Sequence, residues 1–422
     1  MQKKSILIWT TLLMTVAFVN ACSNTNSGEA SYLENTAGRM FSNATPSDTR
    51  CNQITKGDLN GFVPFSRDSA WNSEISGQAA DPQSSAKISA YVNRVGYNPA
   101  LHGDFSSEYG EVYNVVDSST QPLQMISIDE YPGESDLVPV PLPDTSVVKG
   151  GSQNCNDGGD CHLFVLDRNQ CWLYETWQTS FDGVRWHASN MAVWDMLGTS
   201  KRPYGWTAAD AAGLSVFAGL VRYDEVARGV IPHAIRFTLG HTGNTFVAPA
   251  THSAGYDSAA FPMGTRFRLK RNFDVSAYSK ADQVIFTAMK NYGLILADNG
   301  SDLEIAGAND ARWEVSDVVA LKGAHLSDFE VMPAGKVMSR ADLPTGARAE
   351  IGDFSASSMS AKTGESVTLS WSTSGEAWTF IDVLGPVRGN SITVAPTATT
   401  TYTLNATNAY GRSTRSVTVE VN

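Results

Sequence analysis

Side chains able to do acid–base chemistry and side chains able to hold a sugar are concentrated between residues 160 and 260 of this 422-residue chain. Aromatic rings stack on the apolar faces of sugars, and a pair of carboxyl groups can cleave a glycosidic bond. We therefore predict a carbohydrate site in this part of the chain. Five of the seven histidines and five of the ten tryptophans lie there: His162, His187, His233, His241, His252, Trp172, Trp177, Trp186, Trp194 and Trp206.

Three carboxylates in this part are candidates for the acid and the base of a glycoside hydrolase: Glu175, Asp195 and Asp210. Glu175 lies in an apolar segment, residues 171–177, which is typical of a buried strand. Apolar neighbours raise the pKa of a carboxyl group, as a general acid requires. Asp195 ends a second predicted strand, where a side chain can reach a cleft. Asp210 is equally suited to capping a helix.

A second chemistry with these residues is elimination, as in a polysaccharide lyase. His187 with a tyrosine could abstract the proton next to a uronate carboxylate, and an arginine could bind that carboxylate. Tyr256 and Arg236 are alternatives for the tyrosine and the arginine. The side chains expected to contact substrate are Trp177, Trp186, Trp206, Tyr223 and Arg222.

Several function classes are disfavoured by composition and by motifs. The net charge of −12 argues against nucleic acid as a partner. The sequence has neither a glycine-rich phosphate loop followed by lysine nor a Gly-x-Ser-x-Gly motif, so a nucleotide partner and α/β-hydrolase chemistry are not expected. His233, His241 and His252 match no common metal-ligand spacing, and we predict no metal and no cofactor. A non-catalytic glycan-binding or structural surface protein remains the alternative to an enzyme.

The amino-terminal residues indicate export. Lys3 and Lys4 precede an apolar run at residues 6–19, and Val-Asn-Ala-Cys follows, ending at Cys22. This arrangement resembles a bacterial lipoprotein signal, which implies removal of residues 1–21 and attachment of a lipid to Cys22. Ser23 after the cysteine resembles the pattern of outer-membrane lipoproteins. Residues 22–61, rich in Ser, Asn, Thr and Gly, are expected to be a flexible tether between that membrane anchor and the folded chain.

Four further cysteines allow up to two disulfides, with three connectivities. Cys155 and Cys161 flank a short glycine-containing loop, so we favour a bridge between them, with Cys51–Cys171 as the second. The same loop offers Asn and Asp oxygens to calcium, but it lacks the EF-hand pattern.

The pattern of residues 62–342 predicts a β-sandwich-like core with a few peripheral helices. Residues 161–167 and 171–177 are predicted to form a hairpin. Further strands are expected at residues 188–196, 234–239 and 265–270, the last with arginines on a half-exposed face. Helices are expected at residues 84–95 and from a capping box at Ser279 to Tyr292.

Two stretches resemble known protein groups. Val367-Thr368-Leu369-Ser370-Trp371 and Thr401-Tyr402-Thr403-Leu404-Asn405-Ala406, followed by Gly411, resemble bacterial immunoglobulin-like modules. This implies a small β-sandwich at residues 351–422, which occurs with many functions. Within residues 64–332, the segments at 70–77, 205–214, 219–226 and 296–300 are similar to a group of secreted bacterial proteins of unassigned activity. That similarity therefore implies no catalytic residues.

Overall fold

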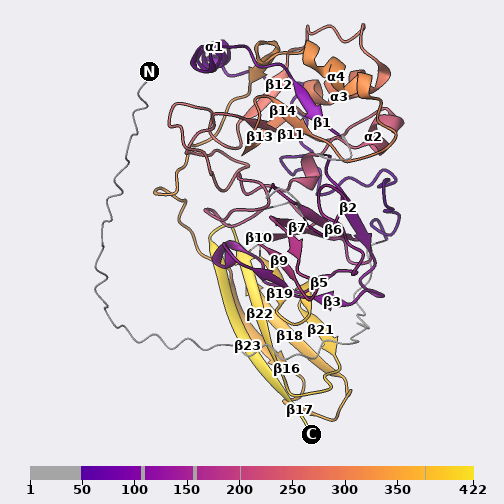
Figure 1. Ribbon diagram of the computed structural model, residues 1–422. Helices are drawn as coiled ribbons and strands as arrows, with labels where there is room; N and C mark the ends of the chain where they lie inside the picture. The colour runs from indigo at the N-terminus through magenta and orange to yellow at the C-terminus, as the bar shows by residue number, and fades with distance from the viewer. Residues whose placement is uncertain (1–48, 106–109, 155–158, 200, 376) are drawn as a thin grey trace, which may run out of the picture. The chain divides into compact units, whose positions relative to one another are not determined.

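The computed structural model describes residues 49–105, 110–154, 159–199, 201–375 and 377–422 (Figure 1). Strands outnumber helices in these ranges, which confirms the prediction of a mainly β fold with few helices. The proposed signal peptide, the proposed lipidation site Cys22, residues 23–48 of the expected tether and Cys155 lie outside the described residues. No helix in the described ranges is long and apolar enough to cross a membrane.

A six-stranded mixed sheet lies in the larger of the apolar cores. Its central strands, β11 (Ile235–Leu239) and β13 (Leu294–Asn299), run parallel, so their carboxyl ends lie at the same edge. All of β11 is buried, as expected for a strand covered on both faces. Across the sheet the order is β1 (His102–Asp104), β14 (Glu304–Ala306), β11, β13, β12 (Arg266–Leu269) and β15 (Phe329–Val331).

Helices pack against this sheet, and both predicted helices are present (Figure 1). Helix α1 (Ser84–Val95) ends at Gly96, whose φ of 83° suits a glycine. Helix α3 (Lys280–Asn291) begins after Ser279, whose hydroxyl accepts a hydrogen bond from the backbone N–H of Asp282. The other helical elements are α2 (Tyr223–Arg228), α4 (Val315–Ala320), and the 3-10 turns η1 (Pro132–Glu134), η2 (Phe217–Gly219), η3 (Leu321–Gly323) and η4 (Leu326–Asp328).

A four-stranded sheet separates the larger apolar core from a smaller one. Its order is β10 (Asn190–Asp195), β7 (Trp172–Trp177), β6 (Leu163–Asp167) and β2 (Tyr113–Val116). The antiparallel pair β6–β7 is the predicted hairpin. Phe164 and Leu173 face the larger core, whereas Val165 and Trp172 face the smaller one. Because side chains alternate along a strand, covering both faces buries nearly the whole hairpin.

Two small sheets border the smaller core. One pairs β3 (Leu123–Gln124) with β5 (Val140–Pro141), and the other has the order β4 (Ile126–Ile128), β9 (Trp186–Ala188) and β8 (Ser180–Phe181).

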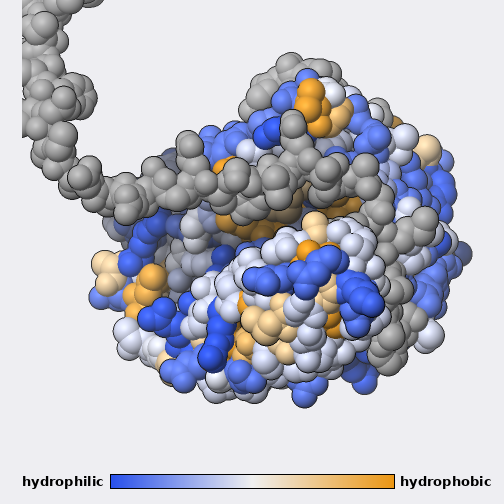
Figure 2. Space-filling model, turned by 90° about the horizontal axis from the view of Figure 1, so that it is seen from below, coloured by the Kyte–Doolittle hydropathy of each residue, from blue (hydrophilic) through white to orange (hydrophobic). Residues whose placement is uncertain are grey.

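The carboxyl-terminal residues form the expected two-sheet sandwich. Both sheets contribute to one apolar cluster that includes Trp371, Tyr402 and Leu404. The first sheet has the order β16 (Glu350–Ala356), β18 (Val367–Ser374), β21 (Ser391–Val394). The second has the order β17 (Ser360–Ala361), β23 (Gly411–Val421), β22 (Thr400–Asn408), β19 (Trp378–Ile381), β20 (Gly385–Val387). In the view of Figure 2, hydrophilic residues cover much of the surface and hydrophobic residues form small groups.

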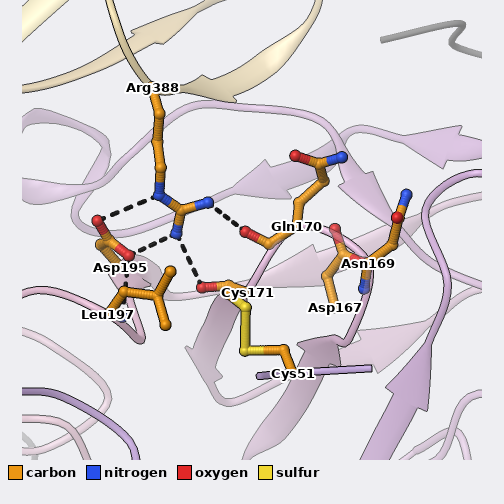
Figure 3. The surroundings of a disulfide bond; sticks show 8 residues. All are labelled: Cys51, Asp167, Asn169, Gln170, Cys171, Asp195, Leu197 and Arg388. Carbon is orange, nitrogen blue, oxygen red and sulfur yellow. Dashed lines mark hydrogen bonds and ion pairs between the residues drawn. A yellow bond between two sulfur atoms is a disulfide. The ribbon is translucent and has the colours of Figure 1, made fainter. Parts of the chain in front are cut away.

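The Cys51–Cys171 disulfide is present, as predicted, and it ties the first described residues to the β6–β7 turn (Figure 3). Cys161 is also disulfide-bonded, and its predicted partner is outside the described residues. Ile54 and Leu59 are fully buried. The packed chain therefore begins before residue 62, and the last part of the expected tether belongs to the core.

Candidate active site

Glu175 is a structural residue of β7. Its carboxylate is fully buried and accepts hydrogen bonds from Trp194 Nε1 at 2.8 Å, Ser215 Oγ at 2.7 Å and the backbone N–H of Phe217 at 2.9 Å. Burial raises its pKa to about 7, against the effect of these donors. The carboxylate thus fastens η2 to the four-stranded sheet. Its predicted role as general acid is corrected to a structural one, because no face of it is open to substrate.

Asp195, the second predicted carboxylate, is paired with a residue of the carboxyl-terminal module. Arg388, which follows β20, forms an ion pair with Asp195 and donates hydrogen bonds to the carbonyl oxygens of Gln170 and Cys171 (Figure 3). The same guanidinium lies 4.1 Å from the ring centroid of Trp172. Asp195 is therefore a docking residue rather than part of a pair of catalytic carboxylates.

Most of the tryptophans do not form the expected sugar platform. Trp186 on β9 is 0% exposed and lies in the smaller core. Trp172 and Trp194 are buried too, because both faces of the four-stranded sheet are covered. Trp206 is covered by two guanidinium groups, those of Arg202 and Arg412, at 5.5 and 4.7 Å from its ring centroid. Trp177 keeps a partly exposed ring.

The predicted elimination group is not assembled either. His187 on β9 lies between Asp129 and Asp182, at 3.2 Å from each carboxylate. Arg222 is buried in an ion pair with Glu225. Tyr223 packs edge-on against Trp313, with ring centroids 5.0 Å apart, and Arg312 covers its face. His187 on β9 and the consecutive residues Arg222 and Tyr223 at the start of α2 therefore have separate partners.

The structure instead gathers seven ionisable side chains where the four-stranded sheet meets β11 and β13. We name this group the acid–base cluster. Of the predicted catalytic residues, it contains Asp210 alone. Its members are Glu111, Lys149, Asp160, His162, Asp210, Arg236 and Asp298.

The first half of the cluster is built around Glu111. Its carboxylate lies 3.1 Å from His162 Nδ1 and 3.0 Å from Lys149 Nζ. Burial would raise the pKa of Glu111, but the charges of His162 and Lys149 outweigh it and lower that pKa to about 2. His162 Nε2 faces the carbonyl oxygen of Ala209 at 3.3 Å, so both ring nitrogens face acceptors. That geometry fits the imidazolium form, in agreement with a raised pKa of His162 due to Glu111 overcoming burial.

The second half of the cluster holds two carboxylates on one guanidinium. Arg236 Nε lies 2.9 Å from Asp210 Oδ2, and its Nη2 bonds the other oxygen of Asp210. Asp298 Oδ2 lies 3.8 Å from the same Nη2. Burial and the adjacent Asp210 raise the pKa of Asp298 well above its ordinary value. Two neighbouring carboxylates sharing one cation favour a shared proton, here on Asp298.

A β-bulge brings Asp298 to this face of the sheet. Arg236 pairs with Ile295 and Phe237 with Leu296, but Thr238 pairs with Asp298 because the register shifts at this point. In an unbroken strand, Asp298 would share a face with Leu296 rather than with Ile295. The bulge reverses that alternation and puts Asp298 on the side of Arg236.

Asp210 is held opposite Asp298 by a short turn. The Gly213 N–H donates to the Asp210 carbonyl at 3.1 Å, and Gly213 has a φ of 69°, which favours glycine. The Ala212 N–H donates to the Ala297 carbonyl of β13 at 2.9 Å. The turn is therefore attached to the same strand that carries Asp298.

The cluster is open to solvent at Asp160, Lys149 and Asp298. The side chains of Lys149 and Asp298 are 23% and 25% exposed, and Asp160 is exposed. Trp177 Nε1 donates to Asp160 Oδ1 at 3.3 Å. Partial desolvation by the surrounding groups would raise the pKa of Asp160, but the positive charge of His162, this indole N–H and Lys149 outweigh it and lower that pKa. Within one solvent-accessible cluster, the shifts in pKa thus favour the protonated form of Asp298 and the anionic form of Asp160.

Sequence reasoning missed Glu111, Lys149, Asp160 and Asp298, and named His162 and Arg236 outside the candidate catalytic set. One usable signal existed for Asp298, an acid directly after the four apolar residues 294–297. In the described ranges, no group of three or more His, Cys, Asp or Glu side chains is placed to hold a metal ion. No family model and no curated protein matches the chain.

Proposed function

We propose that this protein is a glycoside hydrolase in which Asp298 is the general acid and Asp160 the base or nucleophile. The observation that carries the proposal is the opposite direction of their pKa shifts within one solvent-accessible cluster. Glycosidases use two carboxyl groups with unlike protonation, one to protonate the leaving oxygen and one to assist attack at the sugar carbon.

Each neighbouring side chain has a role in this chemistry. Asp210 keeps the proton on Asp298 before the reaction. When Asp298 has given its proton to the glycosidic oxygen, Arg236 stands 3.8 Å away and stabilises the new carboxylate. Glu111 raises the pKa of His162, and the charge of His162 in turn lowers the pKa of Asp160. Trp177 orients Asp160 through its N–H and offers its ring to an adjacent sugar.

We further propose that the hydrolase is anchored in the outer membrane and acts on extracellular polysaccharide. This rests on the signal-like residues 1–21 and on Cys22, which is suited to carry a lipid. The acidic chain favours a substrate without strong negative charge, because like charges repel. Non-catalytic glycan binding remains the alternative. Elimination is disfavoured because His187, Tyr223 and Arg222, the side chains predicted for it, each bond or pack against other partners.

The test is incubation of the purified exported chain with a panel of polysaccharides, with reducing ends as the readout. Asp298→Asn and Asp160→Asn are each expected to lower kcat roughly a thousandfold, as loss of a general acid or base does. Asp182→Asn, which changes an exposed carboxylate next to His187, is the matched control and should retain activity. An unsaturated product detected by ultraviolet absorbance would instead establish elimination. Unchanged activity in Asp298→Asn would refute the assignment.

A further inference from the structure

A hollow of about 660 Å³ lies beyond the carboxyl ends of β11 and β13. It is lined by residues after α1, including Tyr97 and His102, and by the loops that carry His241 and Asp302. Asp302 comes four residues after Asp298, so one loop connects the hollow with the acid–base cluster. Volumes of this size are typical of sites for small ligands.

The carboxylate in the hollow already accepts three hydrogen bonds. Tyr91 donates its hydroxyl to one oxygen of Asp302, and Tyr97 donates to the other. The backbone N–H of Gly240 also donates to Asp302, at 2.8 Å. The lining includes neither lysine nor arginine. A neutral ligand therefore fits this hollow better than an ion of either sign.

The ring of Tyr97 lines the hollow, and the ring of Tyr256 lies beside it, against the lining residues Gly240 and His241. Tyr97 is 55% exposed and is fixed through Asp302. Tyr256 is 65% exposed and donates to the Gly240 carbonyl at 2.8 Å, next to the ring of His241. Anchoring the hydroxyl reduces the conformational entropy lost when a ligand stacks on the ring. Exposed, anchored rings beside polar side chains match a sugar, which has apolar faces and a hydroxyl-bearing edge.

We propose that this hollow is a second sugar-binding site, which holds neutral units of the polysaccharide without taking part in its cleavage. Tyr97 and Tyr256 stack on sugar faces, and His102 and His241 bond hydroxyl groups. The choice of polymer rests on the proposed hydrolase function, whereas sugar binding at the hollow does not depend on cleavage.

The experiment measures binding and hydrolysis in the full exported chain with the same polysaccharide panel. Binding is followed by calorimetry in an Asp298→Asn background, so that the polymer stays intact. Tyr97→Ala and Tyr256→Ala are each expected to weaken binding of the polymer about tenfold. In the otherwise unchanged chain, they should raise KM on the polymer and leave kcat on short oligosaccharides unchanged. Tyr131→Ala, at another exposed tyrosine (41%), is the control and should have no effect.

The outcomes separate this site from the proposed function. Cleavage of a polymer whose binding is unaffected by both tyrosine variants overturns the second site and leaves the hydrolase standing. Binding that weakens in both variants, without cleavage by the unchanged chain, supports the second site and overturns the hydrolase. Failure of every polymer to bind overturns the second site. Thermal unfolding of the variants, expected to match the unchanged chain, excludes misfolding as the cause.

Discussion

Two ion-pair networks in this molecule combine arginine and aspartate side chains in opposite proportions. At Asp136, one carboxylate binds two guanidinium groups, Arg202 at 2.6 Å and Arg412 at 3.1 Å. At Arg236, one guanidinium binds two carboxylates, Asp210 and Asp298. The first network joins the core to β23 of the carboxyl-terminal sandwich. The second lies in the acid–base cluster.

The proportions decide what each network can do. Surplus guanidinium groups stay charged, and they use their remaining donors on carbonyl oxygens: Arg202 donates to Thr207 and Glu134, and Arg412 to Ser135. A surplus carboxylate has another option, since it can take up a proton. The Asp136 network is therefore a fixed joint, whereas the Arg236 network raises the pKa of Asp298 and so favours its protonated form.

Asp136→Asn should break the joint and produce the largest loss of stability. The substitution leaves the buried guanidinium of Arg202 and the partly buried guanidinium of Arg412 without their shared anion. Removing one partner of a buried ion pair costs about 3–5 kcal/mol. Denaturant unfolding of the full chain measures the change, with the exposed Asp353→Asn as the control. A loss below about 1 kcal/mol would contradict the assignment of Asp136 as the joint.

Asp298→Asn should have the opposite effect on stability while removing activity. The folded-state pKa of Asp298 is raised above its ordinary value of 3.8, so the folded chain binds more protons than the unfolded chain above that pH. Its contribution to the free energy of unfolding therefore falls as the pH rises from 3.8 through the raised pKa. The variant should lose this slope and be at least as stable as the unchanged chain at neutral pH. Parallel pH–stability curves for the two proteins would sink this prediction.

Glu111 should make the free energy of unfolding depend on pH in the opposite direction. Its pKa is lowered from 4.5 to about 2, so the unfolded chain binds more protons between these values. Stability that is present above pH 4.5 should decline by roughly 3 kcal/mol as the pH falls toward 2. The measurement is the difference between the unfolding curves of the unchanged chain and Glu111→Gln over this range. Glu350→Gln, at an exposed glutamate, should leave the curve unaltered.

Local elements of this fold follow from the sequence because they depend on neighbouring residues. The helix at residues 84–95 is set by apolar spacing and the glycine after it, and the β6–β7 hairpin by two apolar runs around a short turn. The Cys51–Cys171 bond followed from pairing the other two cysteines first. Arg266 and Arg268 show the limit of such patterns: a half-exposed face was predicted for both, but Arg268 is buried and only Arg266 is partly exposed. They donate instead to backbone carbonyls, such as those of Ala70 and Ile75.

The acid–base cluster depends on features that a sequence pattern does not carry. Glu111 and His162 are 51 residues apart in the chain and meet through tertiary packing. The side of the sheet that Asp298 faces depends on the bulge opposite Phe237 and Thr238. Asp210 and Trp177 were predicted on local grounds, but their partners were not. The density of tryptophans led to the wrong prediction of a sugar platform for a related reason. Because the hairpin is covered on both faces, its tryptophan rings pack into the apolar cores.

Arg388→Ala should cause the smallest loss of stability among these variants, because the contact of Arg388 with Asp195 is only partly buried. The side chains of Arg388 and Asp195 are 29% and 31% exposed, so water screens their ion pair and its loss should cost about 1 kcal/mol. Unlike Asp136→Asn, this variant leaves no fully buried charge, and Asp195 can be solvated where it stands. Limited proteolysis between the core and the sandwich should become faster, whereas Arg415→Ala, whose guanidinium bonds Gly352 within the sandwich, should not change that rate. A destabilisation as large as that of Asp136→Asn would mean that the docking contact, rather than the proportion of charges, determines the strength of the joint.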